Sequence, residues 1–255
     1  MEAVSLQERV RAISPNHELI VYDTSSLYGE QGRFRVLQFA DGAVQGAMDM
    51  DKPERIVLEY PRAIIHLMDW NGASFEDVFI IGHGIGTIAG HYAGKRCKVA
   101  ELDADVVELS RRHFGCHGDN VIIGDGRRVL EREPNHTYDY IVLDAFTELG
   151  TPRHLISRGF FGMAREKLDA CGALLLNVAG RGGNDQLLNA IHATLSDTFA
   201  YVTAFALPQE GGGDARNVVM MARDEPIAYL ARRMAGFAEL RLGRGHLLED
   251  EGEWL

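Results

Sequence analysis

A glycine-rich turn follows the first buried strand that the sequence predicts. Residues 78–81 are apolar and β-branched or aromatic, and they run directly into the stretch GHGIG at residues 82–86. Such a run is typical of a strand covered on both faces. Glycines let a backbone approach a ligand closely, and the N–H groups at the start of a following helix favour an electron-rich group. We therefore expect ligand contacts from Gly82, His83, Gly84 and Gly86. The alternative is a tight turn without a ligand.

Acidic residues end the next three predicted strands. Glu101 stands nineteen residues beyond Gly82, where an acidic side chain can accept hydrogen bonds from both ribose hydroxyls of a nucleoside. Asp125 and Gly126 form a glycine-flanked turn, where a carboxylate can accept from an adenine amino group. Asp144 ends the fourth strand. Together these positions predict a site for the adenosyl part of S-adenosylmethionine or a relative. A nicotinamide cofactor is less favoured, because little chain remains outside the sheet for a substrate domain.

The elements that must position these residues alternate between strand and helix. The predicted strands are 77–81, 97–101, 120–123, 139–144, 171–178, 199–206 and 216–222. The predicted helices are about 87–93, 103–114, 126–132, 156–169 and 184–196. This alternation predicts a parallel sheet with helices on both faces. The link before the last strand is too short for a crossover helix, so that strand should pair antiparallel with its predecessor. The predicted fold is α/β, a class I methyltransferase-type Rossmann fold whose seven-stranded sheet ends in an antiparallel strand.

Three regions are expected along the chain. Residues 1–52 predict a small N-terminal β region, because apolar runs alternate there and Asp41-Gly42 is a hairpin signal. Residues 53–222 form the Rossmann-like nucleoside-binding catalytic domain, which opens with a helix. Residues 223–255 hold one helix, expected at 226–236, and an acidic tail.

Composition and charge limit the classes of protein to which this chain can belong. The 255 residues carry a formal net charge of −11, which argues against a nucleic-acid partner because such a partner needs a basic face. No apolar run is long enough to span a membrane, and the first residues lack a secretory pattern. Three dispersed cysteines fit a reducing compartment, so a cytoplasmic location is expected. His113, Cys116 and His117 lie close in sequence, but no second cluster accompanies them, so no metal is expected.

Several motifs between about residues 33 and 206 resemble the spermidine synthase (polyamine aminopropyltransferase) family. The stretch RVLQFADGAVQ is similar to the family's hairpin, so Gln45 corresponds to the glutamine that touches the nucleoside donor. YPRAIIHL resembles the family's tyrosine-bearing helix and maps Tyr60 and His66. VFIIGHGIG, VAELDADVVELSRRHF, IIGDGRRVL and YDYIVLDAF follow further family motifs. The chain resembles a divergent, spermidine synthase-like member.

The resemblance implies an aminopropyl transfer from decarboxylated S-adenosylmethionine to a small amine, with release of methylthioadenosine and without a metal. The amine attacks the methylene carbon beside the sulfonium and must first lose its proton. A strand-end carboxylate helped by a tyrosine hydroxyl can orient the amine and take that proton, and Asp144 and Tyr60 correspond to these groups. A homodimer is compatible with the sequence.

Departures from the family pattern leave donor and acceptor open. The family's acid in the glycine turn is Ile85 here, and its second loop acid falls on Thr147, with Glu148 next to it. The glutamate after the helix tyrosine is Arg62, which either faces a donor carboxylate or lies on the solvent side of its helix. Glu148, His66 and Arg62 are the candidate substrate contacts. The alternatives are methyl or 3-amino-3-carboxypropyl transfer from intact S-adenosylmethionine, or a nucleoside-binding protein without catalysis.

Overall fold

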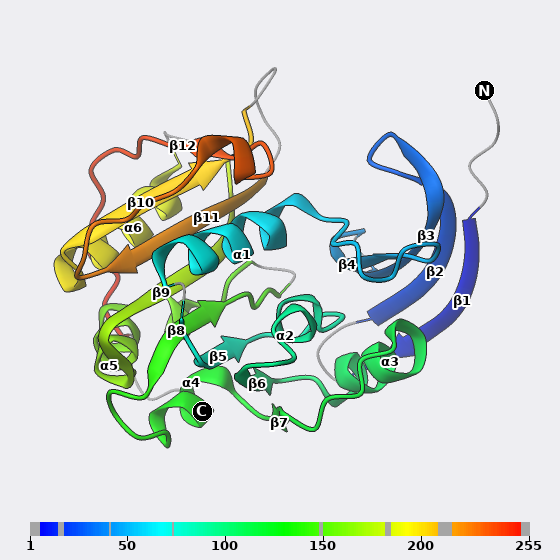
Figure 1. Ribbon diagram of the computed structural model, residues 1–255, viewed down its shortest axis with the longest axis horizontal. Coiled ribbons are helices and arrows are strands. Elements are labelled where there is room, and N and C mark those ends of the chain that lie inside the picture. Colours follow the sequence, from blue (N-terminus) through cyan, green and yellow to red (C-terminus); the bar gives the residue numbers. More distant parts are fainter. Residues whose placement is uncertain are drawn as a thin grey trace.

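The chain folds into two sheets, as the computed structural model in Figure 1 shows. It describes residues 6–14, 18–40, 42–72, 74–147, 150–181, 185–208 and 216–250. The N-terminal sheet has the order β1-β2-β3-β4, and its neighbours pair antiparallel. Its strands are β1 (Leu6–Ile13), β2 (Glu18–Leu27), β3 (Glu30–Phe39) and β4 (Val44–Asp49). The expected hairpin joins β3 and β4, although its Asp41 lies outside the described residues. The sequence patterns do not predict β1 individually.

The second sheet has the order β12-β10-β11-β9-β8-β5-β6-β7. Strands β5 to β9 pair in parallel, and β11 runs antiparallel to both β9 and β10. The strands are β5 (Asp77–Ile81), β6 (Arg96–Glu101), β7 (Val121–Ile123), β8 (Tyr138–Leu143), β9 (Leu168–Gly180), β10 (Tyr201–Ala206), β11 (Arg216–Arg223) and β12 (Ala238–Glu239). The seven expected strands and the reversed last one are confirmed, and the short β12 adds an eighth at the edge.

Helices cover both faces of this sheet (Figure 1). They are α1 (Glu59–Asn71), α2 (Thr87–His91), α3 (Ala104–Phe114), α4 (Gly126–Glu131), α5 (Arg158–Lys167) and α6 (Gln186–Thr198). Helices α4, α5 and α6 contribute Leu130, Phe160 and Ile191 to one core, while α1 and α2 bury Leu67 and Ile88 in another. Burial of each such side chain contributes about 1.5–3 kcal/mol to stability. None of the helices in the described ranges is both long and apolar enough to cross a membrane.

The N-terminal sheet packs on α3 and on the glycine turn. Leu19 and Leu37 of that sheet bury their side chains together with Leu109 of α3, and Ile85 of the turn packs against the same cluster. The side chain of Ser14, which follows β1, donates a hydrogen bond to the carboxylate of Asp103. These contacts fix the sheet beside the carboxyl ends of β5 and β6.

The helix expected at 226–236 does not form. The described chain there is irregular apart from the 3-10 turn η2 (Ala231–Arg233). The side chain of Asn71, at the end of α1, accepts from the Ala228 N–H at 2.9 Å and donates to the Ala228 carbonyl at 2.8 Å. The backbone N–H and carbonyl of Ala228 are therefore paired by α1 rather than within a helix.

Candidate active site

A cavity of about 330 Å³ opens between the N-terminal sheet and the carboxyl ends of β5, β6 and β8. Ligands bind at this edge in doubly wound sheets. Of the residues proposed from the sequence, those that line it are Gln45, Tyr60, Gly82, His83, Gly84, Glu101, Asp125, Gly126 and Asp144. Gly86 lies in the adjoining cleft of the glycine turn. Within the described residues, no three His, Cys, Asp or Glu side chains are arranged to hold a metal ion.

The glycine turn needs its glycines for conformational and steric reasons. Gly82, Gly84 and Gly86 have φ values of +97°, +52° and +81°, in the left-handed region that side chains disfavour. A Cβ added at Gly82 would lie 2.0 Å from the carbonyl oxygen of Asp144. This close approach of the two backbones brings the end of β5 against the end of β8, so the turn and Asp144 share one site.

Glu101 is held with its carboxylate facing the cavity. Its Oε2 accepts the His83 N–H at 2.8 Å, and its Oε1 accepts the Asp103 N–H at 2.9 Å. Burial raises the pKa of Glu101, although these N–H groups act in the opposite direction. Each carboxylate oxygen keeps a lone pair, so the group can accept two further hydroxyl protons.

Asp125 lies at the start of α4 in contact with a histidine that was not proposed from the sequence. Its Oδ1 accepts the Arg128 N–H at 3.0 Å, and its Oδ2 lies 2.7 Å from His154 Nε2. Burial acts to raise the pKa of Asp125, but the hydrogen bonds from His154 and Arg128 outweigh it and lower the pKa. At Gly126, an added Cβ would lie 2.2 Å from Cγ2 of Ile81, so glycine lets α4 pack against β5.

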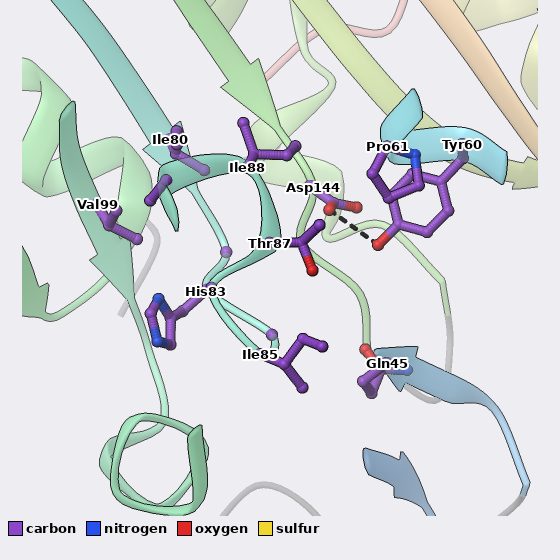
Figure 2. Close-up of a pocket in the computed structure, with 14 residues that line it drawn as sticks. Gln45, Tyr60, Pro61, Ile80, His83, Ile85, Thr87, Ile88, Val99 and Asp144 are labelled. Carbon is purple, nitrogen blue, oxygen red and sulfur yellow. Dashed lines mark hydrogen bonds between the residues drawn. The ribbon is translucent and has the colours of Figure 1, made fainter. Parts of the chain in front are cut away.

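Asp144 and Tyr60 are hydrogen-bonded to each other, as Figure 2 shows. The Tyr60 hydroxyl donates to Asp144 Oδ2 at 3.1 Å, and Asn177 Nδ2 donates to Oδ1 at 2.9 Å. Burial raises the pKa of Asp144 to about 6 despite both donors, and burial with the Asp144 charge raises the pKa of Tyr60. Asn177 was not proposed from the sequence. The sequence feature that could have indicated Asn177 as a site residue is its position near the end of the apolar run that forms β9.

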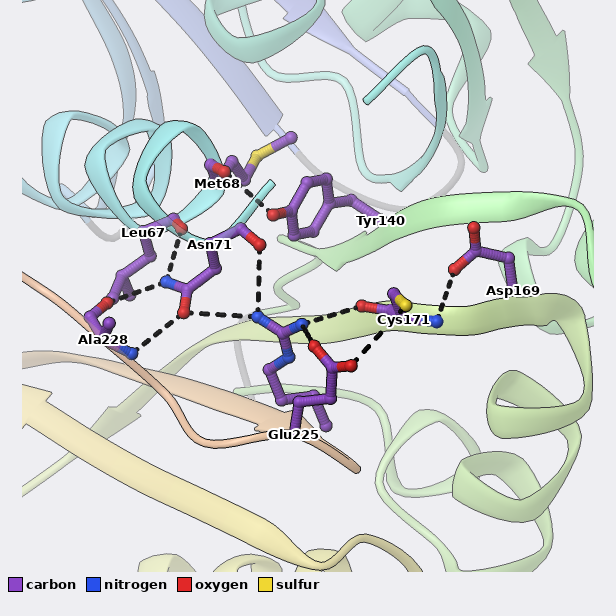
Figure 3. Close-up of polar contacts among 9 residues, drawn as sticks. Leu67, Met68, Asn71, Tyr140, Asp169, Cys171, Glu225 and Ala228 are labelled. Carbon is purple, nitrogen blue, oxygen red and sulfur yellow. Dashed lines mark hydrogen bonds and ion pairs between the residues drawn. The ribbon is translucent and has the colours of Figure 1, made fainter. Parts of the chain in front are cut away.

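Helix α1 carries Tyr60 near its start, and polar contacts hold its other end around Asn71 (Figure 3). Arg223 is only 3% exposed. Its guanidinium donates to the Asn71 carbonyl at 3.3 Å, to the Cys171 carbonyl at 3.0 Å and to Glu225 at 2.7 Å. A buried charge needs such partners to offset its lost hydration. The network joins α1 to β9 and β11.

His83 takes part in the site through its backbone, while its ring points elsewhere. The ring is buried, and its Nε2 lies 2.8 Å from Ser110 Oγ. Because Ser110 Oγ donates to the Val107 carbonyl, it accepts from His83, and Nε2 carries the proton. Burial lowers the pKa of His83 to about 4, so the ring is neutral at pH 7. In Figure 2 the ring lies away from Asp144 and Tyr60.

Two of the three proposed substrate contacts, His66 and Arg62, are not brought into the cavity. His66 Nε2 accepts the Leu230 N–H at 2.9 Å, so its ring holds the C-terminal segment on α1. The Arg62 side chain is 43% exposed and lies 3.6 Å from Glu59, on the solvent side of the helix. Each helical residue rotates by about 100°, so positions two and six beyond the cavity-facing tyrosine face other directions. Glu148 lies outside the described residues.

The sheet order, the reversed strand β11 and the glycine turn beside Glu101 define a class I methyltransferase-type fold. The chain belongs to the spermine/spermidine synthase family, because residues 58–210 match the spermine/spermidine synthase domain model. This assignment confirms the resemblance seen in the sequence.

Two sequence relatives agree with the family assignment, and one solved structure agrees with the fold. A polyamine aminopropyltransferase of Vibrio vulnificus is 28% identical over 211 residues, which cover 76% of this chain and 69% of that protein. Polyamine aminopropyltransferase 2 of Pseudomonas aeruginosa is 28% identical over 186 residues, which cover 67% of this chain and 51% of that protein. The structure of a probable spermidine synthase from Corynebacterium glutamicum superposes with a TM-score of 0.71 at 21% identity, and covers 86% of this chain and 80% of that one. This chain thus spans about half of the Pseudomonas protein.

Proposed function

We propose that this protein transfers the aminopropyl group of decarboxylated S-adenosylmethionine to a small amine and releases methylthioadenosine. The observation that carries the proposal is the pair formed by Asp144 and Tyr60 at the edge of a cavity whose other polar groups suit a nucleoside. Membership of the spermine/spermidine synthase family supports the same reaction class.

Glu101 and Asp125 bind the nucleoside part of the donor in this proposal. Glu101 accepts the two ribose hydroxyls with the lone pairs that its backbone donors leave. Asp125 accepts from the adenine amino group at the far side of the same cavity. The sulfonium carbon is then directed towards the glycine turn and Asp144.

Asp144 is the proposed general base. A carbon–nitrogen bond forms as the carbon–sulfur bond breaks, and the electron pair of the broken bond leaves with sulfur, which becomes a neutral thioether. The proton of the attacking amine passes to the carboxylate. With a pKa of about 6, Asp144 is ionised at neutral pH and remains basic enough to accept that proton. The Tyr60 hydroxyl holds Oδ2 and thereby orients the carboxylate.

The glycine turn affects whether the decarboxylated or the intact form of S-adenosylmethionine is preferred as donor. Ile85 packs its side chain on the N-terminal sheet, and Asp144 is the only carboxylate among the described residues lining the cleft at the turn. The donor's ammonium therefore lacks the partner that the family pattern places there, so preference for the decarboxylated donor should be weaker than in ordinary family members. Arg62 points to solvent and gives an intact donor's carboxylate no partner, which disfavours the intact donor.

Product analysis tests the proposal. The protein is incubated with decarboxylated or intact S-adenosylmethionine and a panel of small amines, and methylthioadenosine and adenosylhomocysteine are measured by mass spectrometry. We expect methylthioadenosine with the decarboxylated donor, and its loss in Asp144→Asn. Adenosylhomocysteine from the intact donor would instead identify a methyltransferase. Tight binding of methylthioadenosine without any turnover would identify a nucleoside-binding protein.

A further inference from the structure

The C-terminal segment is tied along α6 and returns to the start of α5. The Gly243 N–H donates to Asn189 Oδ1 at 2.8 Å, and the Leu248 N–H donates to Thr194 Oγ1 at 2.9 Å. The Leu248 carbonyl accepts the Arg158 N–H at 2.7 Å. These hydrogen bonds place Asp250, the last described residue, at the start of α5.

The carboxylate of Asp250 occupies a fitted position at the start of α5. Its Oδ1 accepts from Arg127 Nη1 at 2.6 Å and from Ser157 Oγ at 2.7 Å. A Cβ at Gly159 would lie 1.8 Å from Asp250 Oδ2, so only glycine leaves room for this carboxylate. The Arg127 hydrogen bond holds the pKa of Asp250 below its usual range. The group is therefore a charged partner of Arg127 at neutral pH.

Arg127 connects this position to the nucleoside end of the cavity. The same Nη1 that contacts Asp250 donates to the His154 carbonyl at 2.9 Å. The His154 ring contacts Asp125 Oδ2 at 2.7 Å. His154 is thus held twice, by its carbonyl through Arg127 and by its ring through Asp125. These two contacts hold the loop between β8 and α5 on the start of α4. Both His154 and Asp125 line the cavity.

We propose that Asp250 is a positioning residue for nucleoside binding, which acts by orienting Arg127 and, through it, His154 and the carboxylate of Asp125. Without Asp250, Arg127 loses its charged partner and its long side chain gains rotational freedom. The His154 carbonyl then loses a fixed donor, and the His154 ring that holds Asp125 Oδ2 is less ordered before the nucleoside binds. The ordering cost then appears as weaker affinity. The inference rests on the proposed nucleoside site.

A double-mutant cycle tests this connection. Methylthioadenosine affinity is measured by calorimetry for the intact chain, Asp250→Ala, His154→Ala and the double variant. We expect Asp250→Ala to weaken binding about tenfold, within the usual range of coupling between neighbouring groups. In the His154→Ala background, the same change should have little further effect. Glu249→Ala is the matched control, because Glu249 is adjacent, 64% exposed and 3.6 Å from Arg158, and it should bind as the intact chain does.

A full effect of Asp250→Ala in the His154→Ala background would overturn the proposal, and so would unchanged affinity in Asp250→Ala. Arg127→Lys replaces Asp250→Ala if that variant does not fold, since it keeps the charge but loses the planar fork. Hydrogen exchange of the unliganded protein supplies a second readout, with faster exchange expected at residues 152–157 in Asp250→Ala than in Glu249→Ala. If the intact chain does not bind methylthioadenosine, the proposed function fails, while equal exchange in both variants would refute the positioning role by itself.

Discussion

Replacing Asn177 by leucine should move the acid limb of the pH–rate profile upwards. Asn177 Nδ2 donates to Asp144 Oδ1 at 2.9 Å and so stabilises the charged carboxylate. Leucine has a similar size but no donor, so burial, which already raises the pKa of Asp144 to about 6, acts with less opposition. The protonated, inactive form then persists to higher pH.

The size of the shift follows from the lost hydrogen bond. A hydrogen bond to a charged group contributes about 1.5–3 kcal/mol. Because about 1.4 kcal/mol corresponds to one pKa unit, the pKa of Asp144 should rise by about one to two units. At neutral pH the variant should therefore be slower, and it should recover when the pH is raised.

The assay is kcat/KM against pH, from about pH 5 to about pH 9, with a fixed donor and amine. The titration of the amine is the same for both enzymes, so the difference between the profiles reports the enzyme alone. Asp144→Asn is the control, because it should be slow at every pH and lack the limb. An acid limb that stays in place or moves down in Asn177→Leu would refute the assignment of Asp144 as the base.

Further predictions concern the nucleoside contact, the catalytic pair and the glycine turn. Glu101→Ala should weaken methylthioadenosine binding by about a hundredfold or more, since two charged hydrogen bonds of about 1.5–3 kcal/mol each are lost; unchanged affinity by calorimetry removes Glu101 from the site. Asp144→Asn should slow turnover by about 10²–10⁴-fold and Tyr60→Phe by less, and an equal loss in steady-state assays would move the main role to Tyr60. Gly82→Ala should lower the melting temperature, because φ of +97° and a Cβ 2.0 Å from a carbonyl oxygen are both unfavourable; an unaltered melting curve contradicts the packing described for the turn.

Local sequence signals identified the elements and the ends of the strands. Glu101, Asp125 and Asp144 were proposed because each follows an apolar run, and all three line one cavity because parallel strands place their carboxyl ends at the same edge. Tyr60 and Asp144 are 84 positions apart, and the family resemblance was needed to associate them. A site residue can be predicted from sequence when its position at the end of a strand is enough to place its side chain at the ligand-binding edge of the sheet.

The residues that sequence reasoning missed or misplaced depend on non-local geometry. Asn177 meets Asp144 because β9 pairs with β8, and His154 meets Asp125 because a loop returns over the sheet edge. Neither contact has a sequence pattern of its own. Arg62 and His66 share a helix with the cavity-facing tyrosine, but the helical rotation turns them away from the cavity. A motif that is read as a linear string does not show this rotation.

Ile85 has a consequence for any attempt to redesign the glycine turn. Its side chain packs against the apolar cluster of the N-terminal sheet, and a Cβ at Gly46 would lie 2.7 Å from it. A carboxylate introduced at position 85 would lose this packing and sit beside apolar groups, which is costly without a hydrogen-bonding partner. An acid at this position therefore requires compensating changes in β3 or β4. The side chain at position 85 couples the glycine turn to the N-terminal sheet, so the two must be redesigned together.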